Sequence, residues 1–269
     1  MGTPITFEKL YNVRDLGGMT TADGQAVRAG RLIRGDQLFS ASEADLERLR
    51  DMDVRKVIDF RSIGEHEEKP DPTIDGAANV FLPIIKDVGV GITRGTEGNT
   101  RIMELFKSGK TISPEFIDEH MRGMYRSFVE DPFSNGQYAQ FFDEVIATAA
   151  EGGATYWHCT AGKDRAGFAT AMMLAALGVP RRDIVADYLQ TNNCLDGVVG
   201  QLMSLFGKQL PSDETREALK RFFVADKSFL GAAFDAIDKH HGSIDAFLSE
   251  RLAVDDEKRR KLRELLLVD

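Results

Sequence analysis

The segment from Ala154 to Leu177 constrains the fold of this chain more than any other part of the sequence. It begins with a short apolar stretch, ATYWH, that is typical of a buried strand, and it ends with AGFATAMMLAAL, which is typical of a buried helix. Only the seven residues from Cys159 to Arg165 connect the two. Strands that pass directly into helices are the units of sheets covered by helices on both faces. We therefore expect an α/β fold.

Two further strands are predicted upstream of this segment. Val54–Phe60 is short and rich in β-branched residues, and Asn79–Ile85 has the same character. The pattern Ser40-Ala-Ser-Glu43 is a capping box, which predicts a helix from about Ala41 to Asp51. Strands that alternate with helices favour parallel pairing. The predicted fold class is therefore α/β, with a mostly parallel central sheet flanked by helices.

The rest of the chain is predicted to contain an insertion and a helical C-terminal part. Five glycines lie between Asp87 and Ser113, in a stretch that is too long for an ordinary connection, and Pro114 then predicts the start of a helix to about Glu130. We expect residues 87–131 to form a lid-like insertion, with a plain surface excursion as the alternative. Further helices are predicted at 138–150 and, within residues 181–269, near 183–205, 215–224, 229–240, 244–252 and 256–267, with caps at Ser212, Ser243 and Asp255.

No repeat, low-complexity tract or proline-rich linker divides the 269 residues, so we expect a single domain over residues 1–269. The longest weakly polar run, Ala166 to Val179, is too short to cross a membrane, and no integral membrane segment is expected. The formal net charge of −9 argues against a nucleic-acid partner, because such proteins carry a basic surface. An anionic substrate would have to be held by a local field.

The cellular compartment is predicted from the cysteine content and from the first residues. Two cysteines cannot form a disulfide framework for a chain of this length, which favours a reducing compartment or a functional thiol. The first residues lack the charged and then apolar layout of a secretory signal peptide. We expect a cytoplasmic protein, with export that needs no signal peptide as an open alternative. The sequence does not indicate an oligomeric state.

The loop from Cys159 to Arg165 combines a thiol with a guanidinium group around a tight turn. A thiol at the end of a strand faces backbone amides and the N-terminus of the next helix, so we expect it to be a nucleophilic thiolate. The planar fork of Arg165 matches two oxygens of a tetrahedral dianion. The amides of a phosphate-binding cradle would come from the residues Thr160, Ala161, Gly162, Lys163, Asp164 and Arg165.

Three other interpretations of this loop are weaker. The nucleotide-binding pattern Gly-x-x-x-x-Gly-Lys-Ser/Thr fails because Trp157 replaces its first glycine and Asp164 replaces its hydroxyl residue. Sulfur transfer by a rhodanese-like loop uses a similar anion cradle but does not need an acid beside the arginine. A chance pairing of a cysteine with an arginine would rarely coincide with a strand before it and a buried helix after it. A phosphate cradle with a built-in nucleophile is therefore the preferred interpretation.

The stretch His158–Gly167, HCTAGKDRAG, resembles the signature of the bacterial PtpB-type atypical protein tyrosine and lipid phosphatases, within the cysteine-dependent phosphatase superfamily. Further matches to this family lie at residues 12–18, 32–38, 57–62 with Glu65 and Pro70-Asp71, and 187–192. The resemblance implies a metal-independent phosphomonoesterase with a core like that of the dual-specificity phosphatases, a helical lid and no cofactor. Its substrate would be a phosphorylated protein, with phosphotyrosine first and phosphoserine, phosphothreonine or a phosphoinositide as further options.

Two features depart from the pattern of the family. Ala166 stands where Thr or Ser usually follows the loop arginine. Thr160 and Ala161 stand where related lipid phosphatases carry a second lysine. The first departure leaves an alternative function open, namely a catalytically weak phosphatase-like module that binds phosphate. The second bears on any preference for phosphoinositides.

A general acid must protonate the leaving oxygen, and two aspartates are candidates. Asp164 lies inside the loop and resembles the aspartate that is assigned as the acid in this family. Asp87 follows the stretch Leu82-Pro-Ile-Ile, where members of the superfamily carry their acid on a movable loop. We favour Asp164 as the catalytic partner of Cys159 and Arg165, because the cradle fixes its position. Asp87 stays as the alternative acid.

The other polar residues are expected to be structural or are left open. Lys163 either adds positive potential for the phosphate or is an exposed lysine, and His158 is expected to support the loop. Arg61 is expected to form ion pairs, with substrate contact as the alternative. Cys194 is expected to be a small core residue, with a resolving thiol as the alternative. No metal site is predicted, because the remaining histidines show no ligand spacing: His66, His120, His240 and His241.

Overall fold

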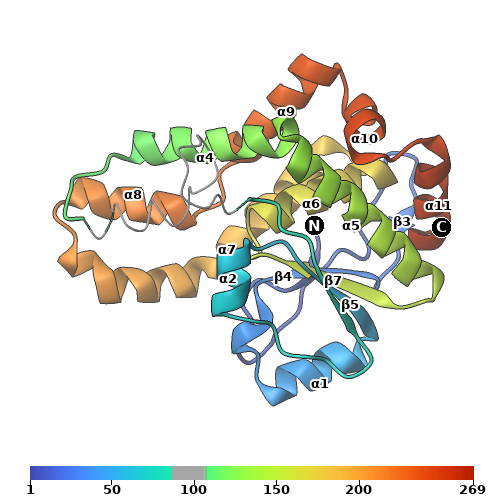
Figure 1. Cartoon of the computed structure of the whole chain (residues 1–269), viewed down its shortest axis with the longest axis horizontal. Helices are drawn as coiled ribbons and strands as arrows, with labels where there is room; N and C mark the ends of the chain where they lie inside the picture. Colours follow the sequence, from blue (N-terminus) through green and yellow to red (C-terminus); the bar gives the residue numbers. More distant parts are fainter. Residues whose placement is uncertain (87–105, 107) are drawn as a thin grey trace.

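The computed structural model describes residues 1–86, 106 and 108–269, and its central element is a six-stranded sheet with the order β1-β2-β4-β7-β5-β6 (Figure 1). The parallel strands are β4 (Leu32–Gly35), β7 (Ala154–His158), β5 (Val54–Asp59) and β6 (Ala78–Phe81). Two short antiparallel strands form one edge, β1 (Thr3–Pro4) and β2 (Arg14–Asp15). The predicted α/β class with a mostly parallel central sheet is confirmed.

Strand β7 lies inside the sheet, and every residue in it is buried. It pairs with β4 on one side and β5 on the other, so that His158 lies opposite Gly35 and Asp59. The carboxyl ends of parallel strands meet at the same edge of a sheet. The loops that follow Gly35, Asp59 and His158 therefore converge at this edge.

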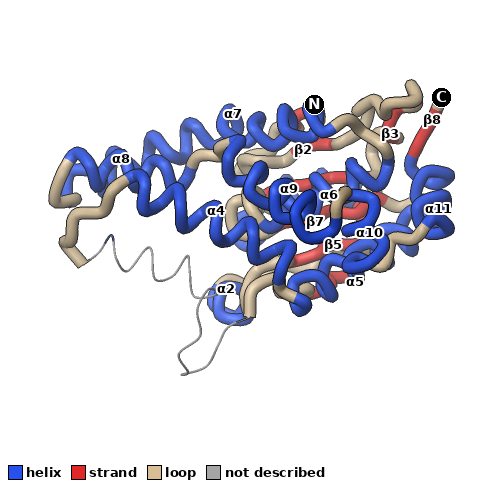
Figure 2. Tube along the Cα trace, turned by 90° about the horizontal axis from the view of Figure 1, so that it is seen from above, coloured by secondary structure: helices blue, strands red, loops and turns tan. Residues whose placement is uncertain are grey.

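Helices cover both faces of the sheet, as Figures 1 and 2 show. α1 (Glu43–Asp51) packs on one face, and α5 (Pro132–Ala150) and α6 (Arg165–Leu177) pack on the other. Neighbouring residues of β7 serve the two layers, since Tyr156 belongs to the first apolar cluster and Trp157 to the second. The Trp157 indole donates a hydrogen bond of 3.0 Å to the hydroxyl of Thr170 in α6. This bond fastens the buried helix to the central strand.

The capping box at the start of α1 lies two residues after the predicted one. The Ser42 side chain accepts a hydrogen bond from the Asp45 amide, and the Asp45 carboxylate accepts one from the Ser42 amide. The predicted box beginning at Ser40 is therefore wrong. Leu38–Ser40 form a turn of 3₁₀ helix, η1, which delays the α-helix. The Asp45 carboxylate also binds backbone amides of the N-terminal segment, a contact that no local pattern reveals.

Two other elements have bounds that differ from the predicted ones. β6 ends at Phe81, whereas the apolar pattern continues to Ile85. α5 begins at Pro132 and not at Tyr138, because the Asp131 side chain accepts a backbone hydrogen bond in the first turn and caps the helix there. The start of α5 is therefore set by its cap rather than by its first apolar residue.

Several short helices and strands in the structure are not predicted from the sequence pattern. α2 (Ile63–Glu68) lies in a polar stretch and is opened by a capping box in which Ser62 pairs with Glu65. A separate two-stranded sheet joins β3 (Ala26–Val27) to β8 (Leu267–Val268) and so ties the C-terminal end to a segment near the start of the chain. Strands of two to four residues are too short to show a period in the sequence.

The C-terminal part is helical, as predicted. Its helices are α7 (Arg181–Phe206), α8 (Asp213–Phe223), α9 (Lys227–His241), α10 (Ile244–Leu252) and α11 (Asp256–Leu266), with a turn of 3₁₀ helix, η2 (Gly207–Gln209), after α7. The side chains of Ser212, Ser243 and Asp255 accept backbone hydrogen bonds at helix starts, which confirms the three predicted caps. No helix in the described part of the chain combines the length and the apolar character needed to span a membrane.

The helix predicted after Pro114 is α4 (Pro114–Glu130), which packs along α8 and α9 (Figure 1). Ser113 caps it, as the Ser-Pro pattern indicates. Residues 87–105 and 107 of the predicted insertion lie outside the described residues. The lid interpretation therefore stays a prediction.

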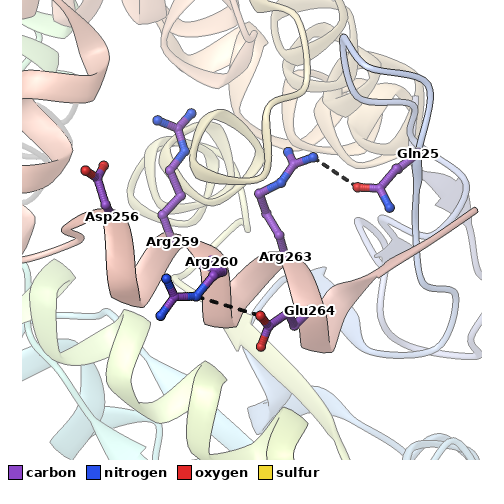
Figure 3. A pocket seen from close by; sticks show the side chains of 6 residues that line it. All are labelled: Gln25, Asp256, Arg259, Arg260, Arg263 and Glu264. Carbon is purple, nitrogen blue, oxygen red and sulfur yellow. Dashed lines mark hydrogen bonds and ion pairs between the residues drawn. The ribbon is translucent and has the colours of Figure 1, made fainter.

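The two ends of α6 meet different partners. Its N-terminus follows the loop at Arg165, whereas the carbonyls at its other end, in Ala175–Leu177, accept hydrogen bonds from Arg259 and Arg263 of α11. Figure 3 shows these two guanidinium groups with Arg260 around a surface pocket of about 450 Å³. The C-terminal helix thus places positive charge at the end of α6 where the helix dipole is negative.

We expect Arg259→Met to lower the free energy of unfolding by about 1–2 kcal/mol, because it removes two hydrogen bonds to carbonyls at the end of α6 and one to the exposed carboxylate of Asp245. Arg260→Met is the matched control, since Arg260 is largely exposed and lies 3.8 Å from its carboxylate partner Glu264. Urea unfolding of the two variants measures the difference. Equal stability of the two variants would contradict the capping role of Arg259.

Candidate active site

The loop between β7 and α6 turns at Gly162. This residue has a φ of +65°, and a Cβ atom there would lie 2.2 Å from the carbonyl oxygen of Gly35. Glycine satisfies both the backbone conformation and the close approach. The turn presses the loop against the end of β4 and leads the chain into α6. Cys159, 3% exposed, and Arg165 therefore stand at the two ends of one small ring of peptide groups.

Three carbonyl groups of the loop are bound from beneath. The backbone amide of Gln37 donates to the carbonyl of Thr160 at 3.3 Å. The side-chain amide of Asn12 donates to the carbonyl of Ala161 at 2.9 Å, and the guanidinium of Arg34 donates to the carbonyl of Gly162 at 2.6 Å. In a planar trans peptide the N–H points opposite to the C=O. Carbonyls held toward the protein therefore turn the next amides toward the outside. This arrangement can bind an anion through backbone N–H groups.

A buried ion-pair network supports Arg34. Its guanidinium lies 3.2 Å from the carboxylate of Asp187, which also lies 3.5 Å from Nε of Arg14. Burial lowers the pKa of Arg34 to about 10, aided by the charge of Arg14, so Arg34 stays a cation at neutral pH. Burial alone would raise the pKa of Asp187, but the two guanidinium groups lower it below its usual range. The family-like stretches that contain these residues thus serve to hold the loop.

Arg165 forms a two-pronged ion pair with Glu65 of α2. Its Nη1 lies 2.5 Å from Oε2 and its Nη2 lies 3.1 Å from Oε1 of Glu65, and Nη2 also donates to the Thr160 hydroxyl. Burial alone would raise the pKa of Glu65, but Arg165 and Thr160 lower it to about 2. Glu65 therefore fixes the orientation of the loop arginine. The Ser62-x-x-Glu65 spacing could have revealed α2, but not this contact.

The side chains of Asp164 and Lys163 both contact helices outside the central sheet. The Asp164 carboxylate accepts a hydrogen bond of 2.9 Å from the Tyr125 hydroxyl of α4. The Lys163 ammonium is buried, donates to the backbone carbonyls of Phe222 and Val224, and lies 3.6 Å from Asp164. The alternative of an exposed lysine is therefore wrong. Burial lowers the pKa of Lys163, although the charge of Asp164 opposes this effect.

Arg61 is held entirely by neighbouring groups. Its five N–H donors bind both carboxylate oxygens of Asp59, Asp71, the side chain of Gln37 and the carbonyl of Lys69. The expected ion pairs are thus present, and substrate contact by Arg61 in this arrangement is excluded. Gln37 also donates its backbone amide to the carbonyl of Thr160, so this network contacts the loop that carries the thiol.

His158 joins the same network. Its Nε2 lies 3.0 Å from Asp71, and burial, which would lower its pKa, is outweighed by Asp71 and Asp59, so the pKa is raised. Ligand atoms of these three residues lie within 4.8 Å of one another, a spacing that would suit a metal ion. Arg61 already binds both carboxylates and supplies the positive charge. We therefore interpret the group as support for the strand end.

The two remaining candidates have different outcomes. Asp87 lies outside the described residues, so its role as the alternative acid stays a prediction. Cys194 lies in α7, where its sulfur accepts a hydrogen bond of 3.7 Å from Arg14. It is partly exposed, so the expected core position is only half correct. Its possible role as a resolving thiol is untested by this contact.

Comparisons with known proteins agree on one family. The model of the tyrosine phosphatase family matches residues 5–268. The chain is 33% identical over 253 residues to a "Putative tyrosine-protein phosphatase" of Cupriavidus necator, covering 93% of this chain and 85% of that protein. It is 28% identical over 257 residues to the "Triple specificity protein phosphatase PtpB" of Mycobacterium tuberculosis, covering 89% and 91%. A tyrosine-protein phosphatase of Nostoc commune is 26% identical over 172 residues, covering 64% and 52%.

The ion pair of Glu65 predicts a pH-dependent stability. Because the native pKa of about 2 lies below the usual 4.5, the pair stabilises the folded protein above pH 4.5, and this contribution is lost as the pH falls toward 2. We expect the native protein to have a higher melting temperature than Glu65→Gln at pH 7. The difference in melting temperature should shrink below pH 4.5. Calorimetry with Glu68→Gln, an exposed position of α2, as the control measures this. A difference that is independent of pH would contradict the assignment.

Proposed function

We propose that this chain hydrolyses phosphotyrosine through a cysteinyl-phosphate on Cys159. The chain belongs to the tyrosine phosphatase family and is a protein tyrosine phosphatase-type enzyme, and the proposal starts from that membership. The observation that carries the proposal is the loop with Cys159 and Arg165 at its ends and its carbonyls bound from beneath. Such a preorganised cradle fits the tetrahedral dianion of a phosphate monoester. The reaction requires no cofactor.

In the first step the thiolate of Cys159 attacks phosphorus. A sulfur–phosphorus bond forms while the bond from phosphorus to the leaving oxygen breaks. The loop amides and Arg165 bind the three other oxygens. Hydrogen bonds to Glu65 and Thr160 use three of the five N–H donors of Arg165, and the N–H of Nε and one N–H of Nη1 take no part in them. Glu65 thus orients the guanidinium without occupying all of it.

Asp164 acts as the general acid in this proposal. Its carboxylic acid gives a proton to the leaving oxygen and becomes a carboxylate. In the second step a water molecule attacks phosphorus, gives a proton to Asp164 and releases the thiolate of Cys159 together with inorganic phosphate. Asp87 is the alternative donor of the same proton.

Phosphotyrosine in proteins is the proposed substrate class, and phosphoinositides come second. A Gly-Lys-x-Arg loop and a relative that is named a triple specificity phosphatase support a broader range. However, the Lys163 ammonium binds the carbonyls of Phe222 and Val224 and is buried, so it does not offer its charge to an inositol headgroup in this arrangement. We therefore place phosphoproteins first.

The proposal includes the organisation and location of the protein. In this proposal residues 1–269 form a single phosphatase domain with a lid-like insertion at residues 87–131. The protein acts in the cytoplasm. The alternative function is a catalytically weak phosphate-binding module, which Ala166 favours because it lacks the usual hydroxyl. The nucleophile, the loop arginine and the acid are all present, which favours the enzyme.

Cys159→Ser is expected to reduce kcat for p-nitrophenyl phosphate by several powers of ten, because a neutral hydroxyl is a far weaker nucleophile than a thiolate. Binding of a phosphotyrosyl peptide should survive, since the amides and Arg165 remain. Steady-state rates in EDTA and calorimetric titration with the peptide measure the two effects. A serine variant with more than about a hundredth of the native kcat would contradict nucleophilic catalysis. Native protein that binds the peptide without turnover would favour the binding module.

Asp164→Asn and Asp87→Asn separate the two candidate acids. An alkyl phosphate needs more protonation of its leaving group than an aryl phosphate with an acidic phenol. We expect Asp164→Asn to lose activity mainly on the alkyl phosphate and Asp87→Asn to lose less, equally on both. The ratio of kcat/KM for the two substrates is the measurement. The reverse pattern would move the acid to Asp87.

A further inference from the structure

Asp164 occupies the N-cap position of α6 without capping that helix. An aspartate at an N-cap usually accepts a hydrogen bond from an amide in the first turn. The N-cap aspartates of α5, α9 and α11 all do so: Asp131, Asp226 and Asp255. Among the described residues of α6 the Asp164 side chain makes no such bond, and its own backbone is already helical. The carboxylate is therefore held by something other than its own helix.

The partner of this carboxylate is Tyr125 of α4. Its hydroxyl oxygen lies 2.9 Å from Oδ1 of Asp164, and its side chain is 0% exposed. Burial, followed by the charge of Asp164, raises the pKa of Tyr125 well above its usual range. Tyr125 therefore keeps its proton at neutral pH and acts as a donor toward the carboxylate.

A second tyrosine completes a directed chain of hydrogen bonds. The hydroxyl of Tyr188 in α7 lies 2.8 Å from that of Tyr125, and burial raises its pKa as well. Each phenol carries one proton. If Tyr125 donates to Asp164, Tyr188 must donate to Tyr125. Both protons then point toward the carboxylate, and the chain runs from Tyr188 through Tyr125 to Asp164.

This chain selects one of the two carboxylate oxygens. Oδ1 of Asp164 accepts from Tyr125 and lies 3.6 Å from the Lys163 ammonium. An oxygen that faces two donors is the poorer site for a proton. In the neutral acid the proton therefore resides on Oδ2. Tyr125 fixes the rotation of the carboxyl group as well as the oxygen that can transfer a proton.

We infer that Tyr125 is the positioning residue of the general acid, with Tyr188 as its support. The inference rests on the proposed function, since it concerns the acid of that reaction. Neither tyrosine belongs to the strand–loop–helix unit that carries the thiol. α4 and α7 must pack against the loop before Asp164 is aligned, so proton transfer depends on helices outside the central sheet.

Several titratable groups surround this carboxylate. His120 and Tyr125 face it from α4, Tyr138 from α5, Lys163 and Arg165 from the loop and the start of α6, and Tyr188 from α7, with Asp226 near Tyr188. Burial lowers the pKa of His120, which is therefore neutral at pH 7. All of the other groups remain when the Tyr125 hydroxyl is removed, so a changed pH profile can be assigned to that hydroxyl.

Tyr125→Phe removes the hydroxyl and keeps the ring. We expect kcat/KM to fall about ten- to a hundredfold for an alkyl phosphate and much less for p-nitrophenyl phosphate, because a poor leaving group needs the proton. The basic limb of the pH profile of kcat/KM should move to higher pH, because the ionised Asp164 loses a donor. Tyr188→Phe should cause a smaller selective loss of kcat/KM for the alkyl phosphate and a smaller shift of the basic limb.

Two further variants separate positioning from general damage. In an Asp164→Asn background, Tyr125→Phe should cause no further selective loss on the alkyl phosphate. Tyr156→Phe is the matched control, because Tyr156 is equally buried and its hydroxyl donates instead to the Asp36 carbonyl at 2.7 Å. It should lower the melting temperature without moving the basic limb. Equal loss on both substrates in Tyr125→Phe, with an unmoved limb, would overturn the inference.

A measurement without turnover decides the same point independently. In Cys159→Ser protein labelled with ¹³C at aspartate carboxyls, the Asp164 signal is the one that Asp164→Asn removes. Its titration midpoint should rise when Tyr125→Phe is added, and an unchanged midpoint would overturn the inference. Absence of turnover by the native protein would overturn the proposed function alone, since this titration would still test the contact between Tyr125 and Asp164.

Discussion

The ion pair between Arg34 and Asp187 is the interaction on which the loop depends. Both side chains are buried, and Arg34 also donates to the carbonyl of Gly162 at the turn. A buried guanidinium is tolerated only when a carboxylate compensates its charge, and removal of either partner leaves an uncompensated charge inside the protein. Asp187 comes from α7, whereas Arg34 comes from β4. The shape of the anion cradle is therefore tied to the packing of a C-terminal helix on the sheet.

The part of the site that could be predicted is the part whose chemistry is local. Cys159, Gly162 and Arg165 lie within seven residues, and the strand and helix on either side show their own patterns. Asn12 could not be assigned, because it lies 149 positions from the carbonyl that it binds in Ala161. Such a contact follows from the order of the strands in the sheet. Hydrophobic periodicity does not encode that order.

Lys163 shows why the surroundings of a side chain within a recognised motif can stay open at the level of the sequence. From the sequence its ammonium could serve the phosphate or the solvent. The exposed position is excluded, because the end of α8 presents the carbonyls of Phe222 and Val224, and these bind the ammonium in the interior. Buried cations need such partners. The role of this residue was therefore fixed by a helix that lies some sixty positions further along the chain.

The helices outside the central sheet contact the loop of the candidate active site directly. The charged side chains of the loop extend toward elements outside the central sheet, and each has a partner there. Arg165 forms an ion pair with Glu65 of α2, and Asp164 accepts a hydrogen bond from Tyr125 of α4. Lys163 donates to a carbonyl at the end of α8. The α/β core supplies the thiol and the amides. The added helices hold the side chains that the proposed mechanism uses to bind phosphate oxygens and to transfer the proton, so a change in their packing would alter that chemistry while Cys159 stays in place.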